Sequence, residues 1–242
     1  MTISAASYSS KGNRSRNEDQ LSLLENSGGI IAAVADGLGG EGNGDIASLI
    51  AIQTINARLL GNHTTMEKME KAIISANEEI IKMHDNDNRM KSTVAVLCLG
   101  GTRAIAATVG DTRIYQFRKG KVIYQSTDHS VSQMSVSVGK INADKIRGHV
   151  DRHRLTRSLG SRKTVEADLA ELILFLMDAF LLCSDGFWEL VLEEEMAEDL
   201  RTSKNAEEWL NKMRGRIESR ISPTGDNHSA IAIIMTEKDD SI

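Results

Sequence analysis

Four aspartates stand at the boundaries of apolar, strand-like segments, each beside a glycine or a turn: Asp36, Asp111, Asp185 and Asp226. One such aspartate is unremarkable, because its side chain suits turns. Four of them, with Glu18-Asp19 in a polar turn, suggest one converging site whose mutual repulsion needs cations to offset it. Oxygen ligands without a paired Cys or His set favour Mg²⁺ or Mn²⁺ over zinc. Two such ions can activate a water and stabilise a phosphoryl leaving group, so the acids predict metal-assisted phosphoryl chemistry.

Arg14 stands three residues before the Asn17-Glu18-Asp19 turn. A guanidinium can hold a phosphate through two parallel hydrogen bonds, which a lysine cannot do. Taken alone, Arg14 is more simply a solvated surface arginine. Beside acids able to hold cations, it becomes a candidate for binding a substrate phosphate.

Two apolar segments must position the acids. Residues 30–35 form a continuous apolar run that ends at Asp36-Gly37, and residues 180–183 form another that ends at Ser184-Asp185-Gly186. Such runs, bounded by turn residues, are typical of buried strands. A strand ending in Asp-Gly delivers a carboxylate to the rim of a sheet, and the glycine lets its own carbonyl approach a ligand closely.

Strand and helix patterns come in blocks along the rest of the chain, without strict βαβ alternation. This order predicts antiparallel sheet with packed helices, an α+β layered sandwich. The expected helices cover residues 45–60, 64–84, 193–201 and 206–220, and the expected strands cover 3–9, 20–24, 29–35, 93–99, 104–109, 114–117, 122–125, 172–177, 180–183 and 230–235.

Details of two helices follow from spacing. In the first, Ile46, Leu49, Ile50 and Ile55 are expected to form the apolar stripe. In the second, Thr64 to Glu67 fits a capping box, and a methionine-rich stripe from Met66 to Met83 predicts a core face rather than a ligand site.

Composition excludes several classes of protein. The 242 residues carry a net charge of −5 and no long basic run, so no nucleic-acid partner is suggested. No apolar stretch reaches the length of a membrane span, and residues 1–14 lack a signal core. Cys98 and Cys183 lie in apolar runs and are expected to be reduced core residues, which points to the cytoplasm. No Ser/Pro-rich linker interrupts the chain, so residues 1–242 are expected to form one domain.

Seven motifs occur in an order that resembles the PPM family of metal-dependent protein serine/threonine phosphatases, in its compact bacterial form. They cover about residues 8–235 and are Arg14-x-x-Asn17-Glu18-Asp19, Val34-Ala35-Asp36-Gly37-Leu38-Gly39-Gly40, Val109-Gly110-Asp111-Thr112-Arg113, Asp128-His129-Ser130, Leu155-Thr156-Arg157-Ser158-Leu159-Gly160, Cys183-Ser184-Asp185-Gly186 and Asp226-Asn227-His228-Ser229.

The resemblance implies a four-layer α-β-β-α sandwich of two antiparallel sheets flanked by helices. It also implies a site for two Mn²⁺ or Mg²⁺ ions: Asp36 bridges both, Asp185 and Asp226 complete the first, and the Gly37 carbonyl reaches the second, with Glu18 nearby or through water. Asp111 with Asp185 would hold a third ion, and Arg14 would bind the substrate phosphate.

The implied reaction is hydrolysis of phosphoserine and phosphothreonine on proteins. A metal-bridging water would attack directly, without a phospho-enzyme, and residues 132–153 would form a variable flap beside the site. The implied partners are phosphoproteins, among them a bacterial Ser/Thr kinase and its targets, and a monomer is expected.

The chain departs from the family pattern at four places. Leu38 stands where many eukaryotic members carry a histidine proposed as general acid, so leaving-group protonation must come from metal-bound water or another group. Lys91-Ser92-Thr93 replaces the usual Gly-Thr-Thr, and His149-Val150 with His153 departs from a common His-Pro and Asn. The two histidines could form a zinc pair on a helix, but no third soft ligand is near. Phe187-Trp188-Glu189 resembles the variant of phosphatases that oppose a kinase in type VI secretion loci.

Three other functions remain as alternatives. Gly37-x-Gly39-x-x-Gly42 matches the dinucleotide-binding fingerprint, but Asp36 would face a pyrophosphate with like charge, and a long helix follows instead of a second strand. A non-catalytic phosphoprotein-binding module with the same fold is disfavoured because suitable acids occupy every metal position. A metal-dependent nuclease is disfavoured because no basic groove is evident.

Overall fold

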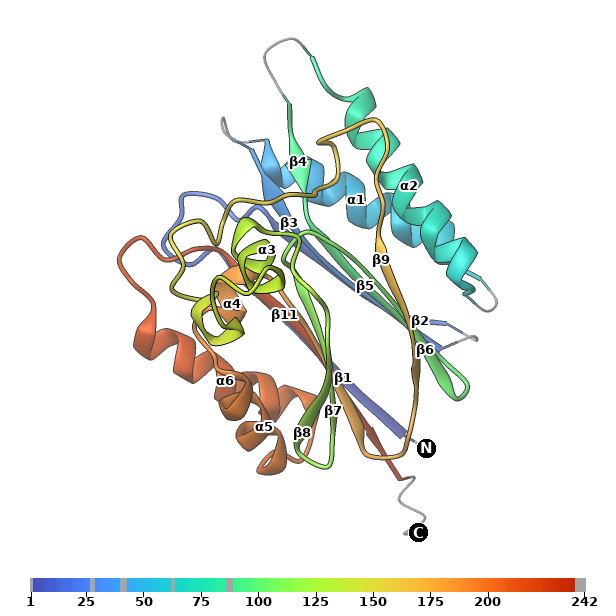
Figure 1. The fold of residues 1–242 in the computed structure, drawn as a ribbon. Helices are drawn as coiled ribbons and strands as arrows, with labels where there is room; N and C mark the ends of the chain where they lie inside the picture. The colour runs from blue at the N-terminus through green and yellow to red at the C-terminus, as the bar shows by residue number, and fades with distance from the viewer. Residues whose placement is uncertain (1, 27–28, 40–42, 62–63, 86–88, 238–242) are drawn as a thin grey trace.

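The computed structural model describes residues 2–26, 29–39, 43–61, 64–85 and 89–237, and Gly40 and Gly42 of the glycine-rich loop lie outside them. Figure 1 shows two sheets packed face to face, with α1 (Gly44–Leu59) and α2 (Met66–Lys82) covering one and α5 (Glu193–Arg201) and α6 (Ala206–Arg220) covering the other. The predicted α-β-β-α sandwich of antiparallel sheets is confirmed.

One sheet contains the first and last strands of the chain. Its order is β1 (Thr2–Ser10), β11 (His228–Thr236), β10 (Asp178–Cys183), β7 (Arg113–Arg118) and β8 (Lys121–Gln125), with antiparallel neighbours throughout. The first strand lies at the edge of this sheet, and the chain returns to it only at its last strand.

The second sheet contains the strand that ends in Asp36. Its order is β2 (Asp19–Asn26), β3 (Gly29–Leu38), β5 (Val94–Gly100), β6 (Arg103–Val109) and β9 (Asp168–Ile173), again antiparallel. The short β4 (Lys91–Ser92) pairs with the end of β3.

Alternation along β3 divides its side chains between two cores. Ile30, Ala32 and Val34 pack between the two sheets, and the residues between them pack under α1 and α2. Side chains alternate along a strand, so Asp36 shares the face of Val34 and points toward the gap between the sheets. The apolar run thus places a carboxylate at the end of the inter-sheet core.

The buried face of α1 differs from the predicted stripe. Ile46 and Leu49 are exposed, and the face toward the sheet is formed mainly by Ala47, Ala51 and Ile55. Because apolar residues occur all around this helix, their spacing does not single out one side. Small alanines allow α1 to approach the sheet closely.

The start of α2 is also one residue later than the capping box implied. Thr65 is the N-cap, and its side chain accepts a hydrogen bond from the Lys68 backbone N–H, so the Thr64–Glu67 box is wrong. The predicted core face is otherwise correct: Met69, Ile73 and other residues of the stripe are buried, although Met83 is exposed.

The strand predicted over residues 172–177 is displaced toward the N-terminus. It is β9 (Asp168–Ile173), and residues 174–177 form the turn that leads to β10. The two strands belong to different sheets, so this turn carries the chain from one sheet to the other. A short helix not predicted from sequence, α4 (Asp185–Trp188), follows β10.

The predicted flap, residues 132–153, holds most of α3 (Val131–Ser137) and a single 3₁₀ turn (Ala143–Lys145) beside α4. Cys98 and Cys183 are buried and free, as expected. Among the described residues, no helix combines the length and the apolar character needed to cross a membrane.

Candidate active site

All seven residues predicted to hold metal or phosphate line one cleft of about 1120 Å³. They come from distant parts of the chain and are Arg14, Glu18, Asp36, Gly37, Asp111, Asp185 and Asp226. The cleft lies where β3 and β10 end and β11 begins, so the residues from both sheets meet at the same end of the sandwich. The convergence inferred from four separate strand boundaries is therefore present in the structure.

The backbone of Asp36 is held on both sides. Its N–H donates to Thr93 Oγ1 at 3.0 Å, and its carbonyl accepts from the Thr93 N–H at 2.8 Å and from Ser92 Oγ at 3.0 Å. Burial and the charges of Asp19 and Asp185, with other acids, raise the pKa of the Asp36 carboxyl well above its usual value. A carboxyl under this much repulsion is a strong ligand for a cation, because an ion would remove the electrostatic cost.

Asp19 is a site residue that the sequence did not single out. It pairs with Asp36 in the β2–β3 register and is 3% exposed. Its Oδ2 accepts a hydrogen bond from Ser184 Oγ at 2.7 Å, while its Oδ1 is buried with no hydrogen-bond partner among the described residues. A buried carboxylate oxygen costs free energy when unpaired. This orphaned oxygen fits a site built for cations or for the water around them.

Gly37 packs its backbone against the start of α1. A Cβ added at Gly37 would lie 1.9 Å from the Gly44 carbonyl oxygen, and one added at Gly44 would lie 2.6 Å from the Gly37 carbonyl oxygen. The Gly37 N–H donates to the Glu18 carbonyl at 3.1 Å, and Ser48 Oγ donates to the same carbonyl at 2.6 Å. The two glycines therefore bring the helix, the strand end and the acidic turn together.

Glu18 occupies the rim of the cleft beside this contact. Partial burial raises the pKa of its carboxyl, a hydrogen bond from the Gly44 backbone opposes that rise, and the charges of Asp45 and Asp226 add to it. Its backbone N–H donates to Asn227 Oδ1 at 2.8 Å.

Hydrogen bonds from the Asn227 side chain join the Arg14-containing loop to the start of β11. Its side-chain NH₂ donates to the carbonyls of Lys11 and Arg16, at 2.8 and 2.9 Å. A Cβ on Gly186 would lie 2.1 Å from the Asn227 carbonyl oxygen, so only glycine fits there. This close contact places Asp185 and Asp226 beside each other, although they come from different segments.

Arg14 and Asp226 form an ion pair at the mouth of the cleft. Arg14 Nη2 donates to Asp226 Oδ2 at 2.8 Å, and the arginine side chain remains 55% exposed. The guanidinium therefore keeps donors directed at the cleft beyond those that bind Asp226.

Asp111 is held by contacts to its backbone. Trp188 Nε1 donates to the Asp111 carbonyl at 2.9 Å, and the preceding Gly110 N–H donates to His129 Nδ1 at 3.0 Å. Burial and the charges of Asp185 and Asp128 raise the pKa of the Asp111 carboxyl well above its usual value.

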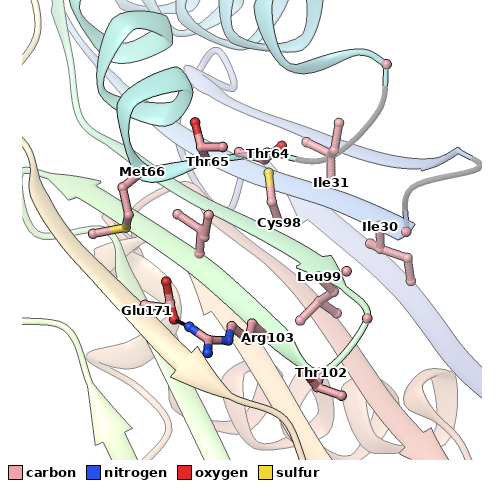
Figure 2. A pocket seen from close by; sticks show the side chains of 15 residues that line it. Ile30, Ile31, Thr64, Thr65, Met66, Cys98, Leu99, Thr102, Arg103 and Glu171 are labelled. Carbon is pink, nitrogen blue, oxygen red and sulfur yellow. Dashed lines mark hydrogen bonds and ion pairs between the residues drawn. The ribbon is translucent and has the colours of Figure 1, made fainter.

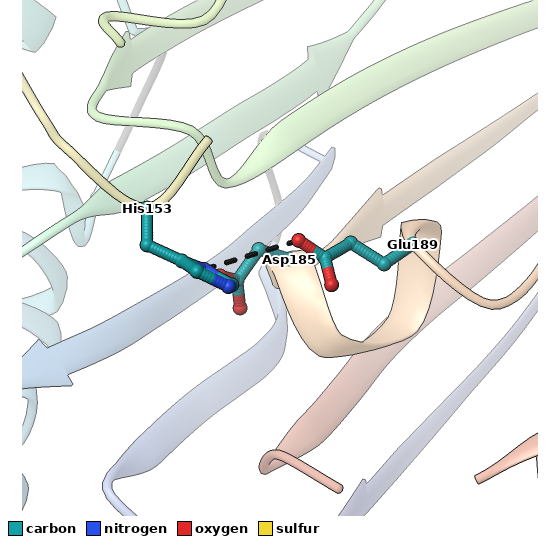
Figure 3. Close-up of side chains that lie close together, drawn as sticks. All are labelled: His153, Asp185 and Glu189. Atoms are coloured by element: carbon teal, nitrogen blue, oxygen red, sulfur yellow. Dashed lines mark hydrogen bonds and ion pairs between the residues drawn. The ribbon is translucent and has the colours of Figure 1, made fainter. Parts of the chain in front are cut away.

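The tightest group of possible metal ligands differs from the predicted set. Among the described residues, His153, Asp185 and Glu189 form the one group of three donor atoms within 4.8 Å of one another, and Figure 3 shows His153 reaching from the flap toward the two acids. His153 Nδ1 lies 3.3 Å from Asp185 Oδ2. Glu189 is the C-cap of α4 and follows Asp185 by four residues, a spacing that places both side chains on the same side of this turn.

The alternative of a His149–His153 zinc pair is wrong. Residues 149–153 form turns rather than a helix, and His149 Nδ1 instead accepts a hydrogen bond from the Asp151 N–H. The sequence offered no signal for the contact between His153 and Asp185, because 32 residues separate them.

A smaller cavity of about 440 Å³ lies at the other end of the second sheet. Figure 2 shows its apolar wall around Cys98 and Leu99 and the ion pair of Arg103 with Glu171. None of the seven predicted residues lines it, so the larger cleft is the candidate active site.

A family model described as protein phosphatase 2C matches residues 8–224. The chain belongs to the protein phosphatase 2C family. The family resemblance read from the seven motifs is confirmed, and with it the prediction of an enzyme, a protein serine/threonine phosphatase.

Relatives of this phosphatase match along most of its length. The serine/threonine phosphatase stp of Listeria monocytogenes is 29% identical over 236 residues, which cover 93% of this chain and 92% of that protein. The catalytic domain of the phosphatase PstP, solved with two manganese ions, is 25% identical with a TM-score of 0.81, covering 97% of this chain and 99% of that one. PppA of Pseudomonas aeruginosa, described as a key regulatory component of T6SS, is 26% identical with a TM-score of 0.80, covering 96% and 97%.

Proposed function

We propose that residues 1–242 form a single catalytic domain that removes phosphate from phosphoserine and phosphothreonine on proteins, using the residues of the acidic cleft. The observation that supports this proposal most strongly is that all seven residues predicted to hold metal or phosphate line that cleft. No other described part of the chain brings together a comparable set of carboxylates and cations.

The donor set fits two Mn²⁺ or Mg²⁺ ions. Asp36 would contact both, Asp185 and Asp226 would complete the first, and the Gly37 carbonyl with nearby Glu18 would serve the second. The raised pKa of Asp36 and the orphaned oxygen of Asp19 support this assignment. When bound, such ions lower the pKa of a shared water and neutralise charge on the phosphoryl group. The manganese ions of the related PstP domain support the choice of metal.

Arg14 has the geometry of a phosphate ligand. It is exposed at the cleft mouth, and its partner Asp226 is one of the proposed metal ligands. When Asp226 contacts a cation, its attraction for Arg14 would weaken, and the guanidinium would be free to donate two hydrogen bonds to a phosphate. Arg14 would thus orient the phosphoryl group toward Asp36.

A third ion is proposed between Asp111 and Asp185. Both carboxyls are buried at the cleft, and repulsion from Asp185 contributes to the raised pKa of Asp111. Trp188 and His129 fix the backbone beside Asp111, so its carboxylate would be presented in one orientation.

The partners follow from the reaction. Phosphoserine and phosphothreonine are made by Ser/Thr kinases, so we infer that this enzyme opposes such a kinase, as a cytoplasmic monomer. The likeness to PppA and the Phe187-Trp188-Glu189 segment support a role beside type VI secretion.

Phosphate release from a phosphothreonine peptide tests the proposal. We expect activity with Mn²⁺, none with EDTA, and a loss of at least 1000-fold in Asp36→Asn, on the order of 4 kcal/mol of transition-state stabilisation. Glu78→Gln, a matched change at an exposed position of α2, should retain full activity. Turnover by Asp36→Asn at the wild-type rate would exclude this mechanism.

A phosphoprotein-binding module is the second candidate, because the cleft would hold a phosphate without hydrolysing it. A folded protein that is inactive with either metal, yet binds the phosphopeptide, would favour that function.

A further inference from the structure

Three cations form one wall of the cleft, beyond the proposed metal ligands. They are Arg89, Lys91 and Arg162, called here the cationic wall. Lys91 belongs to β4, the short strand that pairs with the end of β3. One of them, Lys91, stands where the family pattern has glycine. Its charge in the cationic wall is therefore a departure of this chain from that pattern.

Backbone contacts bring the three cations together. Ser92 and Leu159 exchange two backbone hydrogen bonds, of 3.1 and 2.8 Å, which lays the segment before Arg162 along β4. A Cβ added at Gly160 would lie 2.7 Å from the Met90 carbonyl oxygen, so the two segments touch. Asn77 donates to the Arg162 carbonyl and accepts from the Gly160 N–H, which holds the segment to α2.

The charges of the cationic wall are not neutralised by other described side chains. All three side chains belong to exposed residues, and within the described residues none forms an ion pair or a side-chain hydrogen bond. Other arginines of the cleft are paired: Arg14 with Asp226 and Arg157 with Asp168. Three like charges on adjoining segments repel one another, and an anion bound between them would remove that repulsion.

The balance of charge in the cleft supports an anionic ligand. Six Arg and Lys side chains line it, against five Asp and Glu side chains that the proposed metal ions would neutralise. In the metal-loaded cleft the cations therefore dominate, and the field attracts substrates with charge beyond one phosphate.

The position of Lys91 indicates how far the cationic wall lies from Asp36. Lys91 pairs with Leu38, which follows Asp36 by two residues, and two residues of strand span roughly 7 Å. Two residues of an extended peptide span a similar length, about 7 Å. A phosphoresidue placed at Asp36 would therefore bring a residue about two positions away to the cationic wall.

We propose that the cationic wall is a second anion subsite that selects phosphoproteins carrying another phosphate one to three residues from the phosphate to be removed. The inference rests on the proposed phosphatase function and names its substrate class. A phosphate is favoured over a single carboxylate because it carries up to two charges and accepts bidentate hydrogen bonds from arginine.

The test compares three peptides that differ at one position. Each has one phosphothreonine, and two residues away it carries a non-hydrolysable phosphonate, a glutamate or an alanine. For the wild-type protein with Mn²⁺ we expect kcat/KM to be at least ten-fold higher for the phosphonate peptide than for the alanine peptide, with glutamate between them. The preference should weaken as salt rises, because exposed charges are screened.

Removing the charges of the cationic wall tests whether these cations cause the preference for the phosphonate peptide. In the triple variant Arg89→Gln, Lys91→Gln and Arg162→Gln, the preference should fall below two-fold, while the alanine peptide is hydrolysed within two-fold of the wild-type rate. The control triple variant Arg58→Gln, Lys121→Gln and Arg201→Gln removes exposed charges that do not line the cleft, and it should keep the preference.

The possible failures are distinguishable. If the wild-type protein hydrolyses none of the peptides with metal, the proposed function fails. If it hydrolyses all three at equal rates, or if the wall and control variants behave alike, the function stands and the subsite does not. Binding of the same peptides to Asp36→Asn, followed by fluorescence anisotropy, gives a readout that does not depend on turnover.

Discussion

At the residue scale, Arg14 forms an ion pair with Asp226, which is also a proposed metal ligand. We expect Arg14→Ala to lower kcat/KM for a phosphopeptide by roughly 10- to 100-fold, because a charge-assisted hydrogen bond contributes about 1.5–3 kcal/mol. Most of the loss should lie in KM, measured by steady-state phosphate release. Arg14→Lys should recover only part of the loss, since an ammonium cannot bind the phosphate bidentately. An unchanged KM in Arg14→Ala would contradict the assigned role.

Asp19 gives the metal-free protein a pH dependence. Burial, with the charges of Asp185 and Asp226, raises its pKa from 3.8 to about 7. The folded state therefore keeps a proton that the unfolded chain has released. This contribution to stability is complete below the unfolded pKa of 3.8 and is lost as the pH rises through about 7. In EDTA, we expect the free energy of unfolding of the wild type to fall relative to Asp19→Asn over this window, by on the order of 4 kcal/mol at most.

Urea unfolding of both proteins in EDTA, from about pH 4 to about pH 8, measures that difference. With Mn²⁺ the difference should shrink, because the ions compensate the charge of Asp19. A stability difference independent of pH in EDTA would show that Asp19 carries its charge without cost.

At the scale of elements, a buried ion pair joins β7 to the segment before α3. Arg113 donates to both carboxylate oxygens of Asp128, at 2.8 and 2.6 Å, and stacks 3.5 Å from the centroid of the Trp188 ring. Both paired side chains are less than 5% exposed. We expect Asp128→Ala to destabilise the fold by about 3–5 kcal/mol, because the buried guanidinium loses its bidentate partner and keeps only Tyr115 and the Glu193 carboxylate, the latter at 3.5 Å.

The exposed pair of Arg103 with Glu171 provides the control. Its side chains are 66% and 41% exposed, so Glu171→Ala should cost about 0–1 kcal/mol in the same urea experiment. Equal losses in the two variants would mean that burial of the Arg113 pair has no energetic consequence.

At the scale of the whole molecule, the proposed metal ligands come from both sheets. Asp36 lies two residues before the end of β3 in one sheet, and Asp185 follows β10 of the other. Ions bound between them would join the layers only in the folded state. At 100 times the dissociation constant, binding adds about 2.7 kcal/mol. We therefore expect Mn²⁺ to raise the melting temperature by roughly 5–10 °C over EDTA. Calorimetry measures this rise, and Asp36→Asn should lose most of it; an equal rise in both proteins would place the ions elsewhere.

The sequence predicted the four aspartates of the candidate site because each stands at a boundary of an apolar run, and a strand boundary is a local feature. It predicted most strands and helices because their apolar periodicity is also a local feature. The buried face of α1 was wrong because alanines, rather than the larger Ile46 and Leu49, contact the sheet. Asp19 was read only as part of a polar turn, since its burial depends on Ser184 from a distant segment. The contact of His153 with Asp185 and the gathering of the cationic wall likewise depend on tertiary structure, which no local pattern encodes.

The place of β11 has a consequence for biosynthesis. This last strand lies between β1 and β10, and Figure 1 shows the first and last strands side by side. Asp226 lies two residues before it, so a nascent chain still emerging from the ribosome lacks both an inner strand of one sheet and an acid of the cleft. Pairing across such a sequence separation is slow to form. The proposed catalytic centre is therefore complete only after translation has passed β11, so we expect partly synthesised chains to be inactive on phosphoproteins near the ribosome.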